Sequence, residues 1–194
     1  METGCIKKWA LSIMLFGFVT PVWAHTGIGS THGFMAGFVH PWQGVDHLLV
    51  MFAVGLWAYA QGGKQMWVLP LSFLLLMAIG AGLGFADFTL PYAELWVSLS
   101  VLVFGLIIGL NWQASTAWAM GLVAIVALFH GYVHAAEIAR GANQIGYALG
   151  FLLTTTILQG LGIAAGLFGA KTFSLMRISL GLICAVVGVL LLAS

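Results

Sequence analysis

The chain has 194 residues, of which 62% are hydrophobic and only 6% are charged. A soluble domain carries about 25% charged residues, and the six Lys and Arg and five Asp and Glu side chains of this chain cannot cover a soluble surface. The net charge of +1 excludes the basic field that nucleic-acid-binding proteins use. The composition therefore predicts an integral membrane protein and leaves no room for a separate aqueous catalytic domain.

The first 24 residues have the features of a cleavable secretory signal peptide. Lys7 and Lys8 provide the positive start, and the apolar stretch 9–19 is too short to span a bilayer core about 30 Å thick. Cleavage after Ala24 would make His25 the mature N-terminus and place it outside the membrane, which is the periplasm in a Gram-negative bacterium. An uncleaved first helix is the alternative interpretation.

Residues 25–194 are predicted to form a single all-α domain with six transmembrane helices. The segment 25–41 is rich in Gly and His, and we expect a periplasmic entry segment that dips into the bundle from its outer face, with Pro41 opening the first full helix. Six apolar runs follow, each near the roughly 20 residues that a spanning helix needs. The predicted spans are residues 42–61, 66–86, 93–110, 114–136, 143–168 and 173–193.

Basic residues predict how the bundle is oriented, because cytoplasmic loops carry more Lys and Arg. A periplasmic N-terminus places Lys64, Lys171 and Arg177 inside and only Arg140 outside. If the cell is a Gram-negative bacterium, the predicted location is its inner membrane, crossed several times. Small residues four apart predict close helix packing in lipid; the pairs are Gly80/Gly84, Gly105/Gly109, Gly146/Gly150 and Gly162/Gly166.

The first polar cluster lies at the outer end of the first predicted span and contains His40, Asp46 and His47. The two histidines are seven residues apart, close to two helical turns. Imidazole is a good ligand for nickel, copper, zinc or iron. Asp46 can offset the charge of a divalent cation or orient an imidazole.

The second polar cluster contains His130, His134 and Glu137 at spacing i, i+4, i+7, which places all three on one helix face. The predicted topology puts this cluster near the outer surface, at the same depth as the first. Ionisable side chains at membrane depth are unfavourable and are therefore functional candidates. Two separate segments thus converge on a predicted transition-metal site.

Three further residues are candidates for gathering ions. A mature N-terminal His25 offers both an amine and an imidazole to one metal. His32 is either a second ligand near the entrance or a solvent-facing loop residue. Glu94 begins the third span, where it either complements the helix dipole or lies on the path of the ion.

Two other functions use the same residues. His47 and His134 could ligate a haem from both sides, although the chain has no Cys-x-x-Cys-His motif. A metal-dependent intramembrane hydrolase is the enzymatic alternative, but neither His-Glu-x-x-His nor Gly-x-Ser-x-Gly occurs. No P-loop is present either, so the sequence offers no nucleotide site.

Both clusters resemble the signatures of the HupE/UreJ family. The matching motifs are His40-Pro41-x-x-Gly44-x-Asp46-His47-Leu48-Leu49-x-Met51, followed by Ala53-Val54-Gly55-Leu56-Trp57, and Phe129-His130-Gly131-x-x-His134-x-x-Glu137. The resemblance implies a bacterial membrane protein associated with hydrogenase or urease genes that admits nickel. It also implies that His40, Asp46, His134 and Glu137 are transport residues, joined by Glu94. One departure is Ala135, where the second signature often has Gly.

The sequence therefore predicts a permease, not an enzyme, with no permanent cofactor. Ni²⁺ is the expected transported ion, with Co²⁺ or another first-row divalent ion as alternatives. The expected partners are the lipid bilayer, a second copy of the chain and, indirectly, hydrogenase or urease metal-delivery proteins. Because free imidazole has a pKa of about 6.5, uptake should fall as the external pH drops from about 7.5 to about 5.5.

Overall fold

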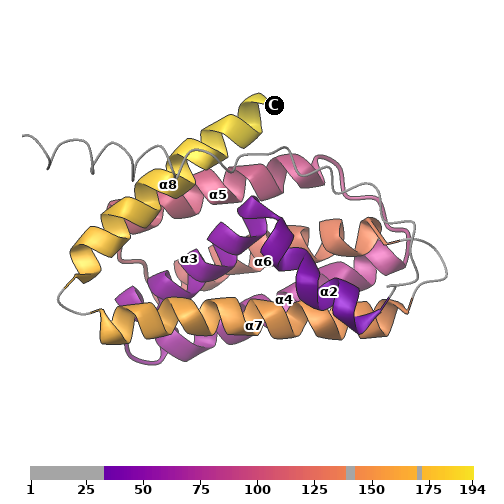
Figure 1. Cartoon of the computed structure of the whole chain (residues 1–194), viewed down its shortest axis with the longest axis horizontal. Helices are drawn as coiled ribbons and strands as arrows, with labels where there is room; N and C mark the ends of the chain where they lie inside the picture. Colours follow the sequence, from indigo (N-terminus) through magenta and orange to yellow (C-terminus); the bar gives the residue numbers. More distant parts are fainter. Residues whose placement is uncertain (1–32, 139–142, 170–171) are drawn as a thin grey trace, which may run out of the picture.

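The computed structural model describes residues 33–138, 143–169 and 172–194, and every regular element in these ranges is a helix (Figure 1). The predicted signal peptide, His25, His32, Arg140 and Lys171 lie outside the described residues. The helices are α2 (Phe34–Gln43), α3 (Val45–Gln61), α4 (Gln65–Phe85), α5 (Ala93–Gly109), α6 (Thr116–Ala136), α7 (Gln144–Phe168) and α8 (Phe173–Ala193).

Four of the described helices, α4, α6, α7 and α8, are long and apolar enough to cross a membrane. Helices α3 and α5 occupy two other predicted spans and are also apolar, but each has only 17 residues. This is shorter than the roughly 20 residues of a typical span. The all-helical fold is thus confirmed, whereas the count of six spans stays a prediction.

The prediction that Pro41 opens the helix of residues 42–61 is wrong. Pro41 lies inside α2, where it removes a backbone hydrogen bond, and α2 ends two residues later. Gly44 then adopts an extended conformation, with φ −89° and ψ 114°, before α3 begins. His40 and His47 consequently belong to two helices rather than to two turns of one.

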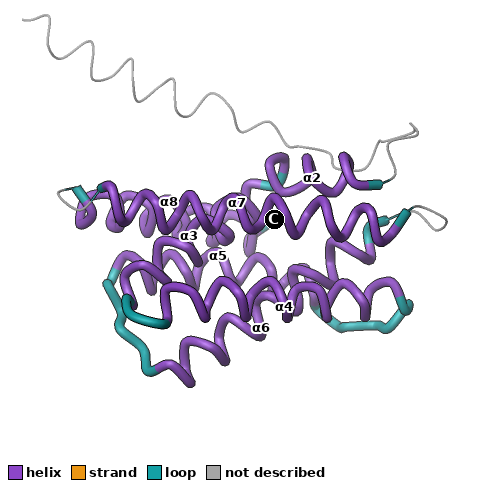
Figure 2. Tube along the Cα trace, turned by 90° about the horizontal axis from the view of Figure 1, so that it is seen from below, coloured by secondary structure: helices purple, strands orange, loops and turns teal. Residues whose placement is uncertain are grey.

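Most of the helices that contact each other run side by side along much of their length (Figure 1). Helix α4 runs along α6, α5 runs along α8, and α7 packs against both α2 and α3. Figure 2 shows α4 and α6 on the side of the molecule opposite α2. The largest fully buried side chains are Trp57, Phe73, Phe104 and Phe151.

Several of the predicted small-residue pairs contain a glycine where two helices touch through their backbones. A Cβ on Gly80 would lie 2.1 Å from a carbonyl oxygen of α6, and one on Gly162 would lie 2.3 Å from a carbonyl oxygen of α3. A Cβ on Gly150 would lie 2.0 Å from the carbonyl oxygen of Phe34. Gly150 therefore lets α2, which carries His40, lie directly on α7.

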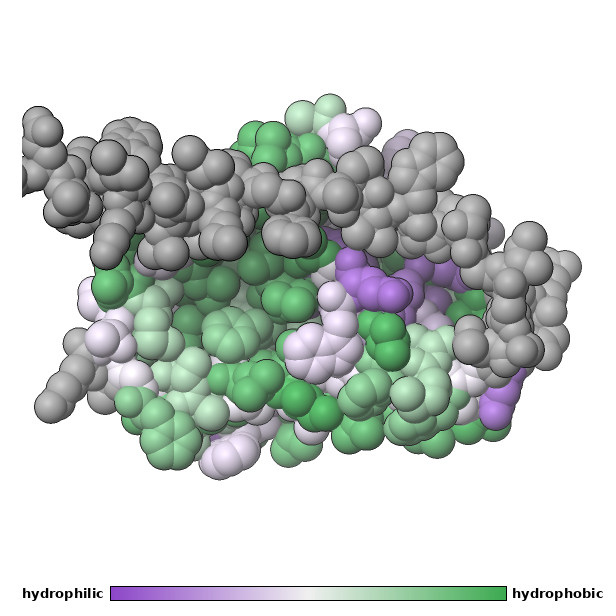
Figure 3. Space-filling view, in the orientation of Figure 1, coloured by the Kyte–Doolittle hydropathy of each residue, from purple (hydrophilic) through white to green (hydrophobic). Residues whose placement is uncertain are grey.

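The described surface is mostly apolar. Figure 3 shows hydrophobic side chains over most of one face, interrupted by a hydrophilic patch where α2 lies. Helix α8 exposes large apolar residues along its length, among them Leu175, Leu182 and Leu190. Such a continuous apolar surface suits contact with lipid.

Candidate metal centre

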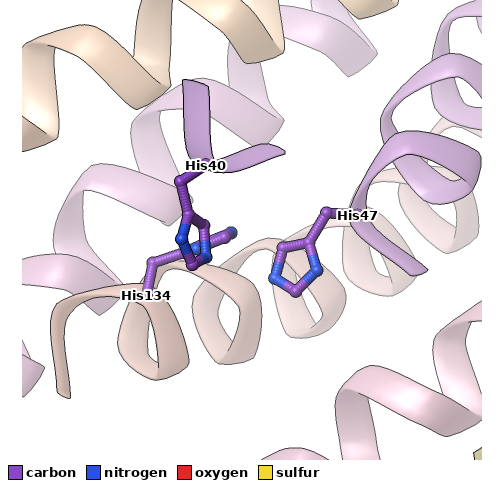
Figure 4. Close-up of side chains that lie close together, drawn as sticks. All are labelled: His40, His47 and His134. Carbon is purple, nitrogen blue, oxygen red and sulfur yellow. The ribbon is translucent and has the colours of Figure 1, made fainter. Parts of the chain in front are cut away.

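Three imidazoles from three helices meet in one place. We call His40 of α2, His47 of α3 and His134 of α6 the histidine cluster (Figure 4). One ligand nitrogen from each lies within 4.8 Å of the others. Two nitrogens on one first-row ion are at most about 4.2 Å apart. Small side-chain rotations are therefore enough to bring all three imidazoles onto one ion.

His134 lies at the centre of the histidine cluster. Its ring centroid is 4.0 Å from that of His47 and 4.6 Å from that of His40, and its side chain is fully buried. Neither of its ring nitrogens has a hydrogen-bond partner among the described residues. A buried polar group without a partner costs about 1–3 kcal/mol, and a bound cation would remove that cost for the acceptor nitrogen.

Asp46 orients His47. The Oδ1 of Asp46 lies 2.7 Å from Nδ1 of His47, which leaves Nε2 of the imidazole for a metal. Asp46 also stands in the first turn of α3, where the helix dipole favours a negative charge. A Cβ at Gly44 would lie 2.9 Å from this carboxylate oxygen and 3.0 Å from Nδ1. Glycine at this position thus makes room for the Asp46–His47 pair.

Glu137 joins the cluster from the end of α6. Its Oε2 lies 3.5 Å from Nε2 of His40, and the side chains are 24% exposed for His40 and 39% exposed for Glu137. This pair is the accessible edge of the site. His40 lies in α2, before the predicted membrane spans. Burial is the main reason that the pKa of its imidazole falls from 6.5 to about 4. Its imidazole is therefore neutral, the form that binds metal, near neutral pH.

His130 lies one turn further into the bundle and is fully buried. Its Nδ1 lies 2.9 Å from the carbonyl oxygen of Val126. Because a carbonyl only accepts, Nδ1 carries the proton and Nε2 is left as a free ligand. The ring centroid of His130 is 5.2 Å from that of His47. His130 thus presents an acceptor nitrogen without a described partner beside the histidine cluster.

The remaining sequence predictions have different outcomes. Glu94 is exposed in the first turn of α5, and no described contact joins it to the histidine cluster. A haem between His47 and His134 does not fit, because their rings touch and leave no space for the macrocycle. Sequence reasoning missed Tyr147 and Phe151 of α7, whose ring centroids lie 6.0 Å from His40 and 4.8 Å from His134. Their i, i+4 spacing is the same as that of ordinary packing residues.

Comparison with known proteins identifies the family. The family described as HupE / UreJ protein matches residues 13–191, which include both histidine-bearing segments. The chain is 38% identical over 179 residues to "Protein HupE" of Rhizobium leguminosarum bv. viciae, a match that covers 91% of this chain and 94% of that protein. No solved structure matches. This chain is a multi-pass membrane protein and belongs to the HupE/UreJ family.

Proposed function

We propose that the chain is a permease that admits a divalent transition metal ion, with Ni²⁺ as the first candidate and Co²⁺ or another first-row ion as alternatives. The observation that carries this proposal is His134, buried with two unpartnered nitrogens at the centre of three imidazoles. Imidazole ligands suit nickel, copper, zinc and iron. The metal is cargo here, and the cluster is the place where it first loses water.

The path of the ion follows from the exposure of the ligands. His40 and Glu137 are partly exposed and receive the ion, whereas His47 and His134 are buried and bind it next. Asp46 supplies negative charge beside His47. Glu94, together with His25 and His32, gathers ions before they reach the cluster. A membrane potential favours inward movement of a divalent ion by about 4.6 kcal/mol per 100 mV.

The proposed location is a bacterial inner membrane, with the mature N-terminus in the periplasm after loss of the signal peptide. Lys64 precedes α4 and Arg177 contacts the end of α5, both at the end of the bundle remote from the start of α3. Basic residues there fit a cytoplasmic end. Reporter fusions after Lys64 should be cytoplasmic and fusions after Asp87 periplasmic. The opposite pattern would overturn the proposed direction of uptake.

Transport is tested by placing the purified chain in liposomes with an interior-negative potential and measuring Ni²⁺ accumulation. A permease accumulates ion, whereas a metal-dependent hydrolase does not. Asp46→Asn keeps the shape of the side chain but removes its charge, and should lower accumulation by about 10–100-fold. Trp67→Phe, at an exposed position of α4, is the control and should change little. No accumulation by the unaltered chain would refute the permease proposal.

The natural recipient of the transported metal is proposed to be the machinery that matures hydrogenase or urease.

A further inference from the structure

Helix α7 carries four core-facing side chains, each four residues after the last: Tyr147, Phe151, Thr155 and Gln159. Residues at this spacing share one helix face, and each step is about 6 Å along the axis. The first two contact the histidine cluster, because the ring of Tyr147 lies near His40 and that of Phe151 near His134. Thr155 and Gln159 therefore continue the same face deeper into the bundle.

Thr155 lies at the depth of His130. Its Oγ1 is 3.9 Å from Sδ of Met77 on α4, and Thr155 is fully buried. Met77 in turn touches the chain next to His130, since a Cβ on Gly131 would lie 1.9 Å from the Met77 carbonyl oxygen. A hydroxyl and a thioether thus lie in contact with each other, on helices that pack beside the segment of α6 that carries the innermost histidine.

Gln159 is one further step along the face and is 1% exposed. Neither Oε1 nor Nε2 of its amide has a hydrogen-bond partner within the described part of the chain. Its backbone carbonyl packs on α3 at Gly55, where an added Cβ would lie 2.0 Å away. Gly55 is eight residues after His47, about 12 Å along α3. Gln159 therefore lies roughly midway between His47 and Gln61, the last residue of α3.

An unpartnered amide at this depth destabilises the fold, and native proteins rarely keep such a group without another use. We propose that Gln159, together with Met77 and Thr155, forms a second binding site for the transported ion, between His130 and the far end of the bundle. We call this site the second stop. This inference rests on the proposed permease function. The ligand is a divalent first-row transition metal ion that keeps part of its water.

The donors of this second stop differ from those of the histidine cluster. An amide oxygen, a hydroxyl oxygen and a thioether are all uncharged, and only the thioether is a soft ligand. They hold a divalent ion more weakly than imidazoles and a carboxylate. An ion that leaves His130 therefore meets a site from which it can leave again, and conduction requires such weak successive sites.

The test compares binding with transport for Gln159→Leu, which keeps approximate volume and removes the amide. Ni²⁺ binding to the purified protein is measured by titration calorimetry, and Ni²⁺ uptake is measured in liposomes. Uptake should fall by about tenfold, the change expected when one bond to a charged group is lost. Binding at the histidine cluster and the melting temperature should stay the same, or the melting temperature should rise. Gln159→Glu, which keeps an oxygen ligand, should retain binding and part of the uptake.

Thr155→Val and Thr156→Val form a matched pair of neighbouring substitutions. Thr156 is exposed and bonds to the carbonyl of its own helix at Leu152, so only Thr155→Val should slow uptake. If Gln159→Leu impairs folding, Met77→Leu provides the same test, because it removes the sulfur at nearly constant volume. Normal uptake by Gln159→Leu, or equal losses of uptake, binding and stability, would overturn the second stop. Absence of uptake by the unaltered chain would instead refute the permease function itself.

Discussion

Polar side chains near the two ends of α3 differ in their hydrogen bonding. At the histidine end, formed by the start of α3 and the end of α6, Nε2 of His47 and both nitrogens of His134 are buried without a described hydrogen-bond partner. At the glutamine end, formed by the end of α3 and the loop before α6, Gln61 donates to the carbonyl of Trp112 at 3.1 Å and accepts from the N–H of Ala114 at 3.3 Å. Trp57 donates to the same carbonyl at 3.0 Å.

This difference separates polar groups that hold the fold from polar groups that are proposed to bind the ion. The bonds of Gln61 and Trp57 fasten the loop before α6 to α3. Arg177 of α8 adds a further link, because it donates to the carbonyls of Ile108 and Gly109 at the end of α5. A cation at the C-terminus of a helix is also favoured by the dipole. Substitutions should therefore reduce transport at the histidine end and stability at the glutamine end.

The largest effect is expected at the centre of the histidine cluster. His134→Ala removes a ligand that touches both other imidazoles, and should lower Ni²⁺ affinity by about 100-fold or more. Uptake should fall with it, while the protein stays abundant in the membrane. Calorimetry and uptake assays measure both values. Full uptake at normal abundance would show that the cluster is not on the metal path.

A smaller effect at the same end is expected for Gly44→Ala. The added Cβ would push the Asp46 carboxylate away from His47 without disturbing the helices, because the crowded atoms belong to side chains. Ni²⁺ affinity should fall by about tenfold, as when an outer-shell partner is displaced. Gly160→Ala is the matched control, since no atom lies within 4 Å of its added Cβ. Equal affinity in the two variants would contradict the positioning role of Gly44.

Substitutions at the glutamine end should change the stability of the fold rather than the affinity for metal. Gln61→Leu removes two hydrogen bonds to the loop before α6, and should lower the free energy of unfolding by about 1–2 kcal/mol. Ni²⁺ affinity should not change. A melting curve in detergent, read beside the calorimetric titration, distinguishes the two quantities. A loss of affinity with an unchanged melting temperature would reverse the proposed division between the ends.

The smallest effect is expected from mild acid. Burial lowers the pKa of His40 to about 4, so its imidazole stays neutral, and able to bind metal, at every pH above about 5. Ni²⁺ binding at the accessible edge should change by less than about twofold between pH 7.5 and 5.5 and be lost near pH 4. A titration of Ni²⁺ binding against pH at constant ionic strength measures this. Half-release near pH 6.5 would show that His40 behaves as a free histidine.

The sequence predicted the positions of most helices, because their apolar runs are long and end at polar or glycine-rich segments. It also predicted that His130 and His134 share a face, since residues at i and i+4 always lie on the same side of an α-helix. It did not predict the break at Gly44, because the apolar run continues on both sides and Pro41 fits a helix start equally well. The predicted pH range did not include the effect of burial, which lowers the pKa of His40 and depends on how the bundle packs.

Gln159 shows a second limit of sequence reasoning. A single glutamine in an apolar helix is indistinguishable from a residue that faces a neighbour or the lipid headgroups. Its burial depends on the packing of α7 against α3, and this contact joins residues more than 100 positions apart, at Gly55 and Gln159. Glu94 is the opposite case. Its sequence position suggested a residue on the path of the ion, but the structure leaves it exposed and separate from the histidine cluster.

The break at Gly44 bears on how long an ion would stay bound at the proposed site. Because an extended residue separates α2 from α3, His40 stands on a different helix from His47 and its Asp46 partner. In the proposed permease, ligands on separate helices would leave the ion one at a time, and each such step has a lower barrier than the simultaneous loss of three bonds. A continuous helix would have bound both imidazoles to one rigid rod. In the proposed permease, one glycine would thus favour short residence times at a site whose ligands, taken together, would otherwise retain the ion.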